Sequence, residues 1–174
     1  TARSDLQLDM TRLRRNRWFN SYLGGFESND ALGLDLRTSL GAAIGRYWIQ
    51  TNDSRLAAIA GLMATVENLN PVFDIDAGTL GKSSQENLEA LLGVQYARYM
   101  FDEPTLDMTV KLRAFPSLTD SGRTRAQLDV GVRWELIKDL FWDLSYYNTY
   151  DSDPPSGSEA TNDYGVVTSI GWSF

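Results

Sequence analysis

Cysteine and histidine are both absent from the 174 residues of the chain. Without cysteine there is no disulfide framework, no thiolate nucleophile and no thiolate metal site. Without histidine, Ser-His-Asp and Cys-His catalysis, imidazole general bases and His-ligated zinc are excluded. Positive charge is also scarce, because the formal net charge is −7, whereas nucleic-acid binding requires a basic face. We therefore expect no enzymatic activity, no cofactor, no metal and no nucleic-acid partner.

Long hydrophobic runs are absent too. No run of about 18 apolar residues occurs, which excludes a transmembrane helix. No signal peptide is visible, because the chain opens Thr1-Ala2-Arg3-Ser4 without Met, so we expect a processed or trimmed N-terminus. The mean hydropathy of −0.30 still allows a membrane protein, because a transmembrane β-barrel alternates lipid-facing and lumen-facing residues.

What the sequence does contain is a period-two alternation of apolar and polar residues, which predicts β-strands with two different faces. The last stretch is the clearest: even-numbered residues from Tyr164 to Phe174 are mostly large and apolar, and odd-numbered ones are mostly small or polar. The segment 30–35 is also compatible with a short helical turn. The predicted strands cover residues 4–13, 17–27, 36–49, 54–67, 87–97, 106–113, 125–136, 140–149 and 163–174.

The connections between these strands alternate in length. Short ones lie at 14–17, 50–54, 101–104 and 138–139, and longer polar ones near 28–35, 68–86, 117–123 and 151–162. Short turns at one end and long loops at the other are typical of outer-membrane barrels. Aromatic residues favour the membrane–water interface, and a predicted aromatic girdle gathers at the short-turn end: Trp18, Trp48, Trp134, Trp142, Trp172 and Phe174.

Together these patterns predict one domain, residues 1–174, folded as an all-β, antiparallel, up-and-down transmembrane β-barrel in the bacterial outer membrane. Its C-terminus would lie on the periplasmic side, so the strand at 4–13 would begin outside. Bacterial single-chain barrels have even strand numbers. We therefore expect about nine strands here and ten in the parent barrel, with eight or twelve as alternatives. The missing N-terminal strand, or a partner chain, would lie beside residues 4–13.

Several stretches resemble a known family. Residues 115–122 (FPSLTDSG), 150–155 (YDSDPP), 171–174 (GWSF) and 37–47 (RTSLGAAIGRY) resemble the salt-induced outer-membrane proteins, a family of undetermined function. The resemblance covers nearly the whole chain. It implies an outer-membrane β-barrel and brings no catalytic residues with it. A last strand that ends in an aromatic residue also looks like the signal read by the outer-membrane barrel assembly machinery.

Charged residues on the inward faces of two neighbouring predicted strands form the candidate site. Opposite charges on adjacent strands are expected to pair, either filling and stiffening a narrow lumen or forming a charged eyelet for a small solute. In a barrel of eight to ten strands little space remains inside, which favours the filled lumen. This predicted lumen charge cluster comprises Asp107, Lys111, Arg113, Arg125, Asp129, Arg133 and Glu135.

The turns and loops carry two further charged features. Asp151-Ser152-Asp153 belongs to a predicted acidic outer loop, which we expect to be solvated; a weak divalent-cation site that bridges lipopolysaccharide phosphates is the alternative. The run Arg12–Arg17 is expected either as a solvated hairpin tip or as a contact to lipid phosphates. The expected partners are thus outer-membrane lipids and lipopolysaccharide.

These observations favour a structural or stress-related envelope protein with a largely plugged polar lumen. A narrow, porin-like solute channel is one alternative. A soluble, lipocalin-like ligand-binding barrel is the other, and it would place the apolar face around Val130 and Leu144 inside.

Overall fold

The computed structural model describes residues 3–29, 34–69, 72–74, 79–81, 84–101, 104–154 and 161–172. Nine strands form one antiparallel sheet in the order β1-β2-β3-β4-β7-β8-β9-β10-β11, and a separate two-stranded sheet consists of β5 and β6. The strands are β1 (Arg3–Leu13), β2 (Trp18–Asn29), β3 (Leu34–Gln50), β4 (Ser54–Leu69), β5 (Val72–Asp74), β6 (Thr79–Gly81), β7 (Ser84–Met100), β8 (Leu106–Pro116), β9 (Thr124–Ile137), β10 (Leu140–Asp151) and β11 (Asn162–Trp172).

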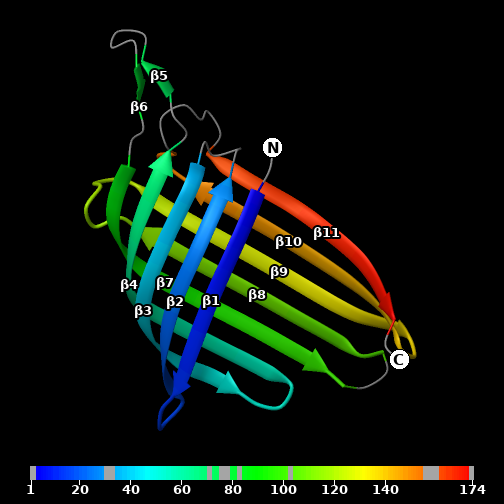
Figure 1. Cartoon of the computed structure of the whole chain (residues 1–174). Coiled ribbons are helices and arrows are strands. Elements are labelled where there is room, and N and C mark those ends of the chain that lie inside the picture. The colour runs from blue at the N-terminus through cyan, green and yellow to red at the C-terminus, as the bar shows by residue number, and fades with distance from the viewer. Residues whose placement is uncertain are drawn as a thin grey trace.

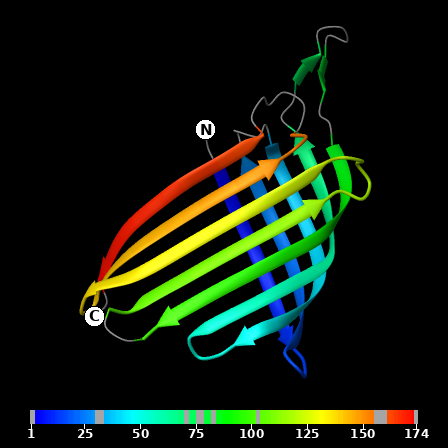
Figure 2. The same cartoon turned by 180° about the vertical axis from the view of Figure 1, so that it is seen from behind.

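The nine-stranded sheet is strongly curled into a half-barrel (Figures 1 and 2). β1 lies across the concave side from β8–β10, and the side-chain amide oxygen of Gln7 on β1 accepts a hydrogen bond of 3.2 Å from Arg113 on β8. The short β5–β6 hairpin projects beyond the end of the sheet that carries the longer connections (Figure 1). None of the described residues forms a helix long and apolar enough to cross a membrane.

The two faces of the sheet differ as the alternation predicts. Odd-numbered side chains point to the concave face, where a small apolar core is buried around Ala43, Met63, Leu91 and Phe115. Most even-numbered apolar side chains lie on the convex face and are exposed, for example Leu40 at 68% and Ile170 at 71%. The buried charged side chains, such as Glu67 and Arg125, also lie on the concave face, so the polar face of the sheet is the inner one.

Tight turns join the strands at one end. Asn16 and Arg17 both have positive φ angles, of 60° and 65°, which is the geometry of a type I′ hairpin turn. The backbone N–H of Trp18 closes this turn on the carbonyl of Arg15 at 3.3 Å. Asp139 also has a positive φ, of 65°, in the two-residue connection between β9 and β10. We call this end of the sheet the short-turn end and the opposite one the loop end.

The prediction of an all-β, up-and-down sheet with nine main strands is confirmed. Every predicted strand is present, and most extend two to three residues further toward the loop end than the alternation indicated. The β5–β6 hairpin lies within the connection predicted near 68–86 and was not foreseen. Most of the segment 30–35, considered as a helical turn, lies outside the described residues, but Leu34 and Asp35 belong to β3.

The tryptophans of the predicted girdle lie on the convex face near the short-turn end. In the strand register Trp134 faces Trp142, and Trp172 faces Leu140. On the neighbouring strands the guanidinium of Arg46 lies 5.7 Å from the ring centres of both Trp18 and Trp48. Phe174, the last predicted member, is outside the described residues.

Candidate functional site

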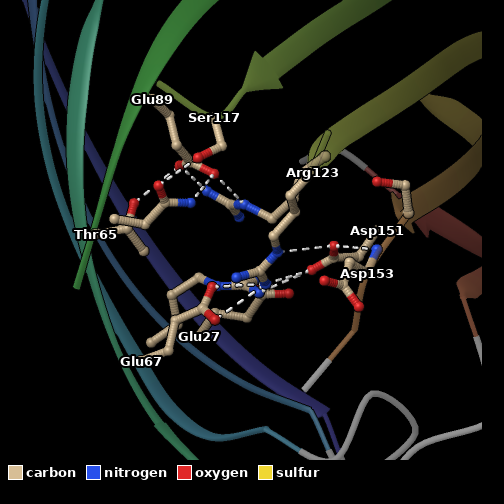
Figure 3. Close-up of polar contacts among 12 residues, drawn as sticks. Glu27, Thr65, Glu67, Glu89, Ser117, Arg123, Asp151 and Asp153 are labelled. Carbon is tan, nitrogen blue, oxygen red and sulfur yellow. Dashed lines mark hydrogen bonds and ion pairs between the residues drawn. The ribbon is translucent and has the colours of Figure 1, made fainter. Parts of the chain in front are cut away.

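The most distinctive feature of the concave face is a group of charged side chains buried together at the loop end (Figure 3). It is built from strands on both walls of the curled sheet. We call it the loop-end network, and its members are Glu27, Arg37, Glu67, Glu89, Arg123, Arg125 and Asp151.

One row of the network crosses three adjacent strands. Glu27 of β2 faces Arg37 of β3, which in turn faces Glu67 of β4. Directly opposite residues of antiparallel strands have close Cβ atoms, so the register places the guanidinium between two carboxylates. Arg37 donates to Glu27 Oε2 at 2.9 Å and to Glu67 Oε1 at 2.8 Å.

The other wall meets this row across the lumen. Asp151 ends β10, and Arg123 directly precedes β9. The Arg123 guanidinium donates to both carboxylate oxygens of Asp151, at 3.1 and 2.7 Å, and to both of Glu67, at 3.1 and 3.0 Å. Arg37 also reaches Asp151 at 3.4 Å. Two arginines therefore tie β3 and β4 to β9 and β10, as Figure 3 shows for Arg123.

A second pair extends the network along β7 and β9. Arg125 and Glu89 form a two-pronged ion pair, with 2.7 Å between Nε and Oε1. The Thr65 hydroxyl donates to Glu89 Oε2 at 2.9 Å. The Arg125 guanidinium also lies 5.0 Å from the ring centre of Phe115, a cation–π contact.

Burial and charge define what this network can do. All seven side chains are at most about a tenth exposed, and three guanidinium groups face four carboxylates. Burial opposes the charged form of Arg123, but its hydrogen bonds and charge contacts with Asp151 and Glu67 outweigh this and raise its pKa. Among the described residues, Glu27 Oε1 is the one buried side-chain oxygen without a hydrogen-bond donor. Because nearly all hydrogen bonds of these buried ion pairs are satisfied, we interpret the network as a rigid cross-link between the two walls of the sheet at the loop end.

The predicted lumen charge cluster is placed on the concave face but is not one cluster. The register brings Asp107 opposite Arg133 and Lys111 opposite Asp129. Within the described part of the chain, however, no two members of the predicted cluster form an ion pair with each other. Arg125 alone joins the loop-end network.

The remaining members of the predicted cluster have different partners. Arg133 lies 3.8 Å from Asp143, in an exposed pair, and 4.3 Å from the ring centre of Phe141. Glu135 accepts hydrogen bonds from the Thr105 hydroxyl at 2.6 Å and from the Asp139 backbone at 3.0 Å. An open groove of about 730 Å³ runs between β1 and β8–β10, and its lining includes Lys111, Asp129, Gly131 and Tyr147.

The expectation of a solvated acidic loop is wrong for Asp151. Its carboxylate is 1% exposed and bound by arginines, and Asp153 contributes a backbone N–H to it at 3.2 Å. The sequence showed an acidic residue between polar neighbours but not the arginines that reach it from other strands. The described residues contain no group of three or more acidic side chains placed to hold a metal ion.

Sequence reasoning missed most of the network. Glu27, Arg37, Glu67 and Glu89 share the inward, odd-numbered parity of the predicted lumen charges, and that parity was the available signal. Arg123 carried no such signal, because it falls in a connection rather than in a predicted strand.

The chain matches, over residues 1–174, the model of a family described as a protein of unknown function, DUF481, and it belongs to that family. A search of curated proteins finds no match.

Proposed function

We propose that this chain forms the wall of a bacterial outer-membrane β-barrel with a structural, stress-related role and a lumen blocked at its loop end. The observation that carries the proposal is the convex face. Its apolar side chains are exposed along whole strands, as Leu8 on β1, Leu40 on β3 and Ile170 on β11 illustrate. Contiguous apolar surface of this extent is unfavourable in water and is what hydrocarbon tails would cover.

Two further observations support a membrane orientation. The tight turns gather at one end of the sheet, which would be periplasmic, and the longer connections gather at the other, which would face outward. The convex tryptophans near the short-turn end, with Arg46 between Trp18 and Trp48, fit the interface with lipid headgroups. Outer-membrane lipids, lipopolysaccharide and the barrel assembly machinery would be the partners. The stress-related part of the role rests on the resemblance to salt-induced outer-membrane proteins.

A pair of substitutions on β3 tests the membrane assignment. Leu40→Arg places a charge on the middle of the convex face and should cost roughly 2–4 kcal/mol of folding free energy in lipid. Gln50→Arg, at the short-turn end of the same strand, should cost at most about 1 kcal/mol. The measurement is denaturant unfolding in phospholipid vesicles, together with the amount of each variant in the outer-membrane fraction. Equal stabilities, with protein that stays monomeric without detergent, would favour the soluble ligand-binding barrel instead.

The proposal includes closure of the barrel by a tenth strand from the same polypeptide, outside residues 1–174. β1 and β11 are the two edges of the sheet. Because they are the first and the last of nine successive antiparallel strands, the two edges run in the same direction. An entirely antiparallel barrel therefore closes only when an odd number of strands is added between the two edges. The smallest such number is one strand, which runs opposite to both edges. At the loop end β2, the neighbour of the edge strand β1, already contacts β11, since the side-chain amide of Asn29 donates to Asp163 at 2.8 Å.

Disulfide cross-linking tests this closure, and residues 1–174 contain no cysteine of their own that would compete with the introduced ones. Strands in one sheet are about 4.8 Å apart, and Cβ atoms in a disulfide are about 4 Å apart. A cysteine at Leu8 should therefore fail to couple with a cysteine at Val166 or Ile170, because one strand separates them. The control pair Leu144 and Thr168, directly opposite on β10 and β11, should couple readily. Efficient coupling between β1 and β11 would show a nine-stranded closed barrel.

The loop-end network favours a blocked lumen over a porin-like channel. It spans the concave face from β2 to β10 with direct side-chain contacts. The protein should show no steady single-channel current in planar bilayers, and regular current steps would support the channel instead.

A further inference from the structure

A second lumen feature lies away from the loop-end network, on the half of the concave face nearer the short turns. It is a partly open cavity of about 130 Å³ lined by residues of β1, β2, β3, β4, β7 and β8. Cavities of about 150 Å³ hold a benzene-sized molecule, so this lumen cavity has room for one small ring. The Arg113–Gln7 hydrogen bond joins β8 to β1 beside it.

One side of the lumen cavity is aromatic. Phe19 and Tyr47 contact each other with ring centres 4.8 Å apart and planes inclined at 44°. Phe19 is nearly completely buried and packs against Gly45, where an added Cβ atom would stand 2.3 Å from Cζ of the ring. Tyr99 extends the aromatic side, with the Arg55 guanidinium 5.7 Å from its ring centre. These rings offer flat apolar surface to a planar ligand.

The other side of the lumen cavity carries an excess of positive charge. Arg55, Lys111 and Arg113 line it, against a single acidic residue, Asp9. Asp9 already accepts hydrogen bonds from the Ser21 hydroxyl at 2.8 Å and from Thr11 at 3.3 Å. Within the described part of the chain, neither Arg55 nor Lys111 forms an ion pair, in contrast to the arginines of the loop-end network. Asp129 lies opposite Lys111 in the register but forms no ion pair with it and does not line the cavity. In a chain of net charge −7, a cavity lining with this excess of positive charge favours an anionic ligand.

We propose that the lumen cavity binds a small organic anion with a planar aromatic body, of the size and charge of benzoate. The ring would pack against Phe19, Tyr47 and Tyr99, and the carboxylate would face Lys111 and Arg55. Charge-assisted hydrogen bonds to a carboxylate are stronger than neutral ones, so charge and shape both contribute to selectivity. This proposal does not depend on the membrane assignment, because it uses concave-face residues alone.

Calorimetric titration of the detergent-solubilised full chain tests the site, with benzoate as probe and the neutral isostere benzamide as comparison. Benzoate should bind at least about tenfold more tightly than benzamide, because each contact to a charged group contributes about 1.5–3 kcal/mol and 1.4 kcal/mol is tenfold. Lys111→Gln and Arg55→Gln should each weaken benzoate binding by about tenfold or more. Arg46→Gln removes the same charge on the convex face at the same end and should leave binding unchanged.

The proposal fails if benzoate does not bind, if benzamide binds as tightly, or if Arg46→Gln weakens benzoate binding as much as Lys111→Gln does. Near-ultraviolet circular dichroism of each variant verifies that the aromatic packing is intact. Phe19→Leu provides a second, charge-neutral probe, since it should weaken benzoate and benzamide equally.

Discussion

The concave face contains two regions in which cationic and acidic side chains lie opposite each other, but only one of the two regions buries and pairs them. In the loop-end network, arginines and carboxylates from both walls are buried and satisfy one another. In the open groove between β1 and β8–β10, Lys111 and Asp129 face each other in register without the short contacts of the network. The difference shows that cross-strand register does not by itself give short, buried ion pairs; in the network the second wall encloses the paired groups. The network therefore holds the two walls together, whereas the groove and the cavity leave space that solvent or a small molecule can enter.

The largest effect should come from breaking the network at Arg37. Arg37→Met leaves four carboxylates against two guanidinium groups and removes the charged donor to Glu27. Removing one partner from a buried ion pair costs about 3–5 kcal/mol, and denaturant unfolding in detergent micelles measures this cost. Glu27→Gln is the matched control: it balances the charge and keeps one acceptor oxygen, so its cost should stay below about 1 kcal/mol. Equal costs would mean that charge neutrality does not matter in the network.

An intermediate effect on stability is expected when a methyl group is added at a glycine in the packed part of the sheet, in contrast to a glycine that lines the open groove. At Gly61 on β4, an added Cβ would lie 2.5 Å from the Cα of Ala43 on β3, whereas at Gly131 on β9 it would meet nothing within 4 Å. Gly61→Ala should therefore destabilise the protein by about 1–3 kcal/mol through overpacking. Gly131→Ala should stabilise it by up to about 1 kcal/mol, because it reduces the entropy of the unfolded chain. The same unfolding assay compares them, and a cost at Gly131 would show that the groove is filled.

The smallest effect is expected in the exposed pair of β9 and β10. Arg133 and Asp143 are 3.8 Å apart, with side chains 51% and 36% exposed. Exposed ion pairs contribute about 0.2–1 kcal/mol, so Arg133→Ala should shift the free energy of unfolding by no more than this. A double-mutant cycle with Asp143→Ala isolates the pair, and a coupling as large as that expected at Arg37 would remove the distinction between the two regions.

The sequence predicted the strands and their faces well but not the site. Alternation with period two is a local signal, so it located the strand of Trp172 and the inward parity of Arg125 from neighbouring residues alone. The network depends on how far the sheet curls, because Arg37 meets Asp151 only when β3 and β10 face each other. No local pattern encodes that curvature. Arg123 was missed because it lies just before a strand, where alternation carries no information.

The Arg37–Asp151 contact joins residues separated by 114 positions in the chain, and this separation has a kinetic consequence. Contacts of such long range form only after the intervening strands have paired. We expect the contacts of the network that join the two walls to be absent from the folding transition state, so that weakening them accelerates unfolding and leaves the folding rate nearly unchanged. Its contribution would be to the lifetime of the native state, because contacts that form after the transition state must break before the sheet can unfold.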